Sequence, residues 1–109
     1  MSDAIDRAVA EAEALLEQAA IARAEAENAD EKRKQVKALM FIKFRDAGSS
    51  AADAAERAMT TPEYLAAADE WMSANITWRR FDGKARGKEL KFEAWRTKAA
   101  TERAAMNLR

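Results

Sequence analysis

A seven-residue repeat of apolar side chains restricts the fold of this 109-residue chain more than any other feature. The repeat occupies positions Tyr64, Trp71, Trp78, Ala85, Phe92, Ala99 and Met106. Such a helix packs along one seam against a partner helix, as in a coiled coil. The segment 3–46 supplies a matching row of mostly small residues, which only Arg33 interrupts: Ile5, Ala12, Ala19, Ala26 and Met40. The repeat therefore predicts two long helices in contact, with large side chains of the second lying over alanines of the first.

Two short segments carry helix stop and start signals. Gly48 follows a basic last turn and Ser50 precedes a new run, which is typical of a C-cap followed by an N-cap. Thr61 and Pro62 form the second signal, because threonine caps helices and proline suits the first helical position. We therefore predict a single domain, 1–109, with helices at about 3–46, 51–59 and 62–107. Gly83 and Gly87 weaken the last helix, and a loop over 82–88 is the alternative to a continuous helix.

Charge is distributed in blocks that favour an antiparallel arrangement. Residues 1–30 carry a net charge of −6, residues 31–46 of +4, residues 47–77 of −4 and residues 78–109 of +6. Folding the chain at 47–61 places acidic blocks beside basic ones and pairs residues whose numbers add to about 107. A parallel arrangement would place like charges together. The predicted fold is thus all-α, an antiparallel, coiled-coil-like helical hairpin with a short connecting helix.

Composition removes most catalytic chemistries. The chain has no cysteine and no histidine, so disulfides, thiol nucleophiles, imidazole catalysis and zinc sites built from these residues are excluded. Its carboxylate pairs diverge on helices, and its glycines do not form a phosphate-binding loop. We therefore expect a non-enzymatic protein that uses no cofactor and has no metal site.

Apolar residues beyond the seam predict self-association. Alanine accounts for 28 of the 53 apolar residues, yet three tryptophans, four phenylalanines and five methionines are too many for one hairpin to cover. We expect a homo-oligomer in which hairpins assemble into a larger helical bundle, although the sequence does not fix the number of subunits. The candidate contact residues are Phe41, Ile76, Leu90 and Trp95. The acidic start and the absence of a long apolar run favour a cytoplasmic protein without a membrane partner.

Two basic segments interleave with aromatic residues, the pattern that single-stranded nucleic-acid binding requires. The candidate binding residues are Lys32, Arg33, Lys34, Lys37, Arg79, Arg80, Lys84, Arg86, Lys88 and Lys91. The alternative is that these cations are paired with the acidic blocks and that the aromatics are core.

Three segments of the chain resemble small helical phage proteins of recombination modules. They are the run from Lys37 to Ser50, the segment Thr61-Pro62-Glu63-Tyr64 and the ending around Phe92–Arg96. In outline the chain is similar to phage recombination mediators of the UvsY type. The resemblance implies an oligomeric protein that binds single-stranded DNA and a recombinase or single-strand-binding protein, in the host cytoplasm. A phage anti-defence inhibitor that acts by protein binding and a purely structural coiled-coil adaptor are the two alternatives.

Overall fold

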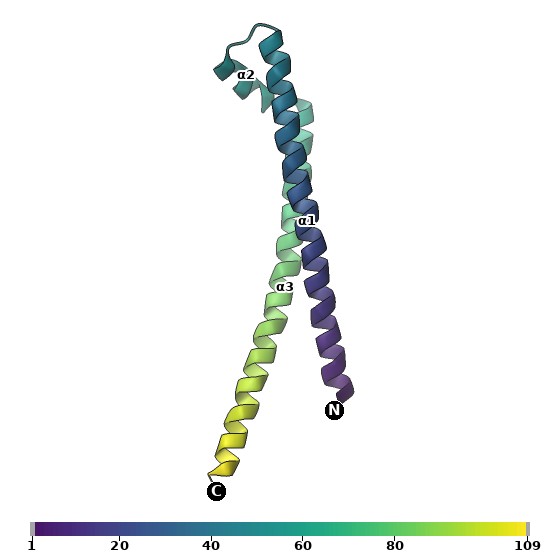
Figure 1. Cartoon of the computed structure of the whole chain (residues 1–109), viewed down its shortest axis with the longest axis vertical. Helices are drawn as coiled ribbons and strands as arrows, with labels where there is room; N and C mark the ends of the chain where they lie inside the picture. The colour runs from purple at the N-terminus through teal and green to yellow at the C-terminus, as the bar shows by residue number, and fades with distance from the viewer. Residues whose placement is uncertain (1, 109) are drawn as a thin grey trace. The chain divides into compact units, whose positions relative to one another are not determined.

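The computed structural model describes residues 2–108 and consists of three helices joined by short turns. Helix α1 spans Ser2–Asp46, α2 spans Ala51–Ala58 and α3 spans Pro62–Asn107 (Figure 1). These bounds differ from the predicted ranges by one residue at most, and no strand occurs within residues 2–108. Helix α3 continues through 82–88 without a break. The predicted all-α fold, two long helices with a short helix between them, is therefore confirmed.

The end of α1 has the hydrogen bonds of a Schellman motif. The backbone N–H of Gly48 donates to the carbonyl of Arg45 at 3.0 Å, and that of Ser49 donates to the carbonyl of Phe44 at 3.0 Å. Gly48 has a φ of 103°, a conformation that side-chain-bearing residues rarely adopt. Glycine at this position therefore ends α1 where the sequence predicts.

The starts of α2 and α3 are capped by hydroxyl side chains. The Ser50 hydroxyl accepts a hydrogen bond from the backbone N–H of Asp53 at 3.2 Å, and the Thr61 hydroxyl accepts one from Tyr64 at 3.2 Å. Pro62 is the first residue of α3, where its missing N–H costs no helical hydrogen bond. Both predicted N-caps are thus present.

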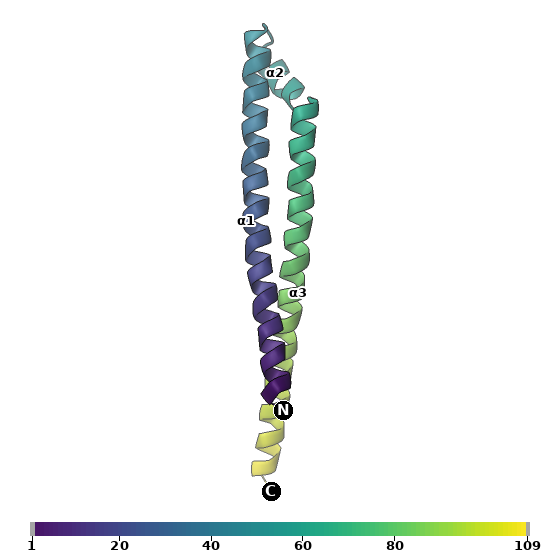
Figure 2. The same ribbon diagram turned by 90° about the vertical axis from the view of Figure 1, so that its right-hand side faces the viewer.

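Contacts divide the chain into two compact units, each containing part of α1 and part of α3. The central unit is Ala20–Trp78; the terminal unit contains the residues up to Ala19 and those from Arg79 onward. In the central unit, α1 runs toward α2 and α3 returns from it (Figure 2). The two long helices are therefore antiparallel there, as the charge blocks predict.

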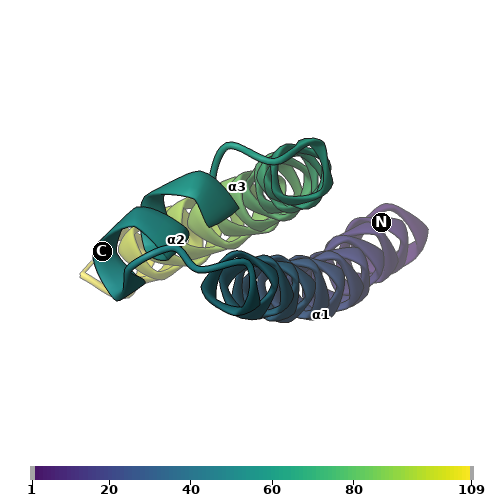
Figure 3. The ribbon, with the colours of Figure 1, turned by 90° about the horizontal axis from the view of Figure 1, so that it is seen from above.

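The register of the central unit differs from the predicted one. The contacting pairs Lys32–Glu70 and Arg33–Trp71 have residue numbers that add to 102 and 104 rather than about 107. Helix α2 explains this offset, because it folds back toward the end of α1 (Figure 3). The Arg57 guanidinium of α2 lies over the Phe44 ring of α1 at 6.0 Å. The last turns of α1 thus pack against α2. The start of α3 therefore lies beside a part of α1 that is further from its C-terminal end than a direct turn between the two long helices would give.

Alanine forms the buried core of both units. Among the described residues, the buried apolar positions are Ala19, Ala22, Ala26, Ala29, Ala54, Ala58, Ala67 and Ala85. The large residues of the α3 repeat are half-buried from Tyr64 to Phe92, whereas Met106 is 73% exposed. Small residues on one helix beneath large residues on the other allow the helix axes to approach closely. The predicted seam is therefore present up to Ala99 and ends before Met106.

Candidate nucleic-acid interface

The candidate cations of the central unit are engaged with neighbouring carboxylates. The Lys32 ammonium lies 2.9 Å from a Glu70 carboxylate oxygen on α3. The Lys34 ammonium lies 3.4 Å from Asp30 and 3.7 Å from Glu31. The side chain of Lys37 is half-buried. The first basic segment therefore offers few cations whose charge is uncompensated.

Arg33 contributes to packing between α1 and α3 in the central unit. Its guanidinium donates to Asp30 at 2.7 and 3.1 Å and to the Tyr64 hydroxyl at 3.1 Å. The same group lies over the Trp71 ring at 4.8 Å, and the side chain is only 23% exposed. The hydrogen bond from Arg33 lowers the pKa of the Asp30 carboxyl, and the bond to Asp30 raises the pKa of Arg33. Arg33 thus packs in the interface between α1 and α3, at the position where it interrupts the apolar row of the sequence.

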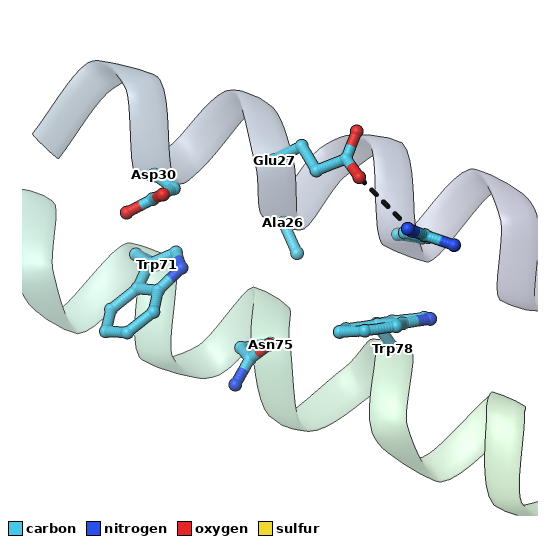
Figure 4. Close-up of a pocket in the computed structure, with 7 residues that line it drawn as sticks. Ala26, Glu27, Asp30, Trp71, Asn75 and Trp78 are labelled. Carbon is cyan, nitrogen blue, oxygen red and sulfur yellow. Dashed lines mark hydrogen bonds and ion pairs between the residues drawn. The ribbon is translucent and has the colours of Figure 1, made fainter. Parts of the chain in front are cut away.

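A second arginine–tryptophan stack occupies the same unit. The Arg23 guanidinium lies over the Trp78 ring at 5.5 Å and bonds to Glu27 at 3.2 Å. Figure 4 shows Trp71 and Trp78 on α3 on either side of Asn75, facing Ala26 on α1. The small cavity here has a volume of about 140 Å³. Because arginines of the chain lie over both indoles, these rings are less available for stacking on bases.

The terminal unit contains a row of exposed cations on one side of α3. This cationic stripe consists of Arg80, Lys84, Lys91 and Lys98. An α-helix turns by about 100° per residue, so these four positions fall within about 40° of one another around the helix axis. The stripe extends over about 27 Å at 1.5 Å per residue. It therefore presents a single line of positive charge on the surface of one helix.

The acidic residues of the same stretch lie on the opposite side of α3. Asp82, Glu89 and Glu93 fall about 180° around the helix from the stripe. Arg86 lies on this acidic side and pairs with Asp82 at 3.1 Å. Within residues 2–108, no carboxylate lies at ion-pair distance from the four stripe cations, so the charges on the two sides of α3 are segregated.

The structure thus separates the candidates of the second basic segment. Arg80, Lys84 and Lys91 belong to the stripe, whereas Arg79 lies on the acidic side with Arg86. Lys88 is half-buried and its ammonium lies 3.4 Å from Glu11 on α1. Lys98 was absent from the sequence-based candidates, although its spacing of seven residues from Lys91 places it on the same side of a helix. Extending the helical spacing beyond the dense basic run would have found it.

The four candidate contact residues are divided between the two units. Phe41 is half-buried in the central unit, where Ile76 is 46% exposed. In the terminal unit, Leu90 is 65% exposed and Trp95 is 57% exposed. Of the four, Trp95 alone lines the large groove of that unit, which has a volume of about 570 Å³.

Comparisons with protein-family models, with curated proteins and with solved structures found no match. Within residues 2–108, no helix has a stretch long and apolar enough to cross a lipid bilayer. The same residues contain no cluster of three or more potential metal-binding side chains.

Proposed function

We propose that this protein is a non-enzymatic accessory protein of DNA recombination that binds the phosphate backbone of single-stranded DNA along the cationic stripe. The proposal depends on one observation: Arg80, Lys84, Lys91 and Lys98 form an exposed line of charge, and the three acids between residues 80 and 98 lie on the opposite side of α3. The net charge of the chain is zero, so only such local segregation would attract a polyanion.

The arrangement of the stripe favours binding that does not depend on base sequence. Lysine and arginine side chains in a line along one helix neutralise successive phosphates. The Lys84 ammonium lies over the Phe81 ring at 5.9 Å, and this contact does not orient it toward a base edge. A single line of cations suits a single backbone. The resemblance to recombination mediators supports the choice of single-stranded DNA and extends the proposal to a recombinase or single-strand-binding protein as the protein partner.

The salt dependence of binding tests this proposal. We would titrate the protein into a labelled oligothymidylate of about 20 nucleotides and follow fluorescence anisotropy. Four neutralised phosphates predict a slope of about −2.8 in log affinity against log salt, which is a loss of about 50-fold between 50 and 200 mM. A duplex of the same length serves as the competitor.

Two triple variants with the same net charge separate the stripe from general electrostatics. The stripe variant Arg80→Gln, Lys84→Gln, Lys98→Gln should lower the magnitude of the slope by about 2. The control variant Lys32→Gln, Lys34→Gln, Lys43→Gln removes the same charge from the central unit and should retain the wild-type slope. Circular dichroism should report unchanged helix content for both. Absence of binding at low salt, or equal losses in the two variants, would overturn the proposal.

A further inference from the structure

The terminal unit contains an open apolar groove between α1 and α3. Its α1 wall carries Ile5, Val9 and Leu16, which remain 46%, 41% and 46% exposed. Phe92 and Trp95 line the α3 wall, and the groove has a volume of about 570 Å³. Aliphatic and aromatic side chains gathered on one surface in this way are typical of an interaction site.

The size of the residues along the α1 rows changes between the two units. In the central unit these rows carry alanines such as Ala22 and Ala26, which α3 covers to 4% exposure. In the terminal unit the same rows contain Ala12 and Ala19 and, in addition, the larger residues Ile5, Val9 and Leu16, which one neighbouring helix leaves half open. Alanine suits a close contact of two helices, whereas larger aliphatic residues fill the core enclosed by four helices. The terminal unit therefore has the composition of half of a four-helix bundle.

The two walls of the groove carry opposite charge. The first turns of α1, residues 3–17, contain five acids and one base. The α3 wall carries Lys88, Lys91 and Arg96, against a single acid, Glu13, on the α1 wall. A helix that suits the basic wall must be amphipathic and acidic, and α1 of a second copy meets both requirements. Two-fold pairing satisfies both grooves at once, because the same patch is used on each chain.

We infer that the groove is a dimerisation surface occupied by the terminal unit of a second copy of this chain. The two units form a four-helix bundle in which α1 of each chain packs against α3 of the other, acidic side against basic side. Trp95 and Leu16 lie in the shared core. Arg80, Lys84 and Lys98 do not line the groove and stay accessible in the dimer. Lys91 belongs to both the stripe and the groove wall, and the stripe variant therefore leaves it unchanged.

Sedimentation equilibrium of the full chain without DNA tests the inference. The wild type should have twice the 12.1 kDa chain mass at micromolar concentrations. The variant Val9→Gln, Leu16→Gln should raise the dissociation constant by about tenfold or more, because each dimer loses four buried aliphatic side chains. The matched control Ile21→Gln, Leu39→Gln changes residues that are 54% and 61% exposed and do not line the groove, so it should remain dimeric.

A variant on the other wall keeps the test decisive if the α1 variant loses helix content. Trp95→Gln removes a side chain that is 57% exposed within one chain, so it should weaken the dimer and preserve the helical signal. A monomeric wild type would overturn the inference, as would a groove variant that dimerises as tightly as the control. The DNA stripe variant should still dimerise, so failure of this inference and failure of the proposed function give different results.

Discussion

Replacing the two glycines within α3 by alanine should stabilise the protein, because both lie inside a helix and have room for a side chain. Gly83 and Gly87 lie in continuous helix on the side turned away from the buried Ala85. A Cβ atom at either position would meet no atom within 4 Å, so the substitution brings no steric cost. Glycine in a helix interior is less favourable than alanine by about 1 kcal/mol. Gly83→Ala and Gly87→Ala should each contribute about that amount, and the double variant about 2 kcal/mol.

Thermal and urea unfolding followed by circular dichroism measure this gain. For a chain of this size, about 1 kcal/mol corresponds to about 4 °C in Tm, so the double variant should melt about 8 °C higher. Gly48→Ala is the control, because a φ of 103° strains any side chain, and it should lower stability by about 1 kcal/mol or more.

An unchanged or lower Tm in the double variant would refute the reasoning. Loss of the dimer in the same variant would show that the glycine side of α3, and not the groove, receives another helix. Retention of the dimer with a higher Tm is the result that agrees with both the open space at the glycines and the proposed dimer.

Three further predictions concern the central unit. Arg33→Met should lower the free energy of unfolding by about 1–2 kcal/mol, since it removes the stack on Trp71 and the hydrogen bond to Tyr64. Arg33→Lys should be destabilised as well, because lysine lacks the planar guanidinium that makes both contacts, and urea titration measures both variants. Asp30 has a lowered pKa, so its contribution to stability should be present above pH 3.8, the usual pKa of the group, and disappear as pH falls through the folded-state pKa. In urea titrations Asp30→Asn should thus be less stable than the wild type at neutral pH, and the two stabilities should converge in acid. Ala22→Leu should destabilise by about 1–3 kcal/mol through overpacking at a site 4% exposed, whereas exposed Ala24→Leu should change stability by about 0.5 kcal/mol or less when both are melted in parallel.

Local signals predicted the helices because they act over a few residues. Gly48, Ser50 and Thr61 end or begin helices through backbone geometry and hydroxyl caps that depend little on distant packing. The register depended on packing instead. Nothing local in the sequence shows that α2 folds back so that Ala54 and Ala58 become fully buried, and this contact determines where α3 meets α1.

The role of each cation depended on what faces it from the other helix. Arg33 interrupts an apolar row, and from the sequence alone its side chain is expected to be exposed to solvent or to bind DNA. In the structure the aromatic ring of Trp71 and the hydroxyl of Tyr64 lie opposite, so its aliphatic stem and its charge are both accommodated. Pairings across helices require the register, which the sequence alone places incorrectly by several residues.

The cationic stripe could be predicted from the sequence because one helix contains all of it. Helical spacing alone places Arg80, Lys84, Lys91 and Lys98 on one side and the acids of the same stretch, residues 82, 89 and 93, on the other, whatever lies across the seam. The same reasoning places both glycines away from the seam, with Gly87 on the same side of the helix as the stripe. Helix α3 of the terminal unit therefore presents a charged side, with the open glycine positions on and next to it, and an apolar wall of the groove that shares Lys91 with the stripe. Variants that leave the shared Lys91 in place should therefore change either DNA binding or dimerisation, and such a variant that changed both would show that the two surfaces are coupled through the helix.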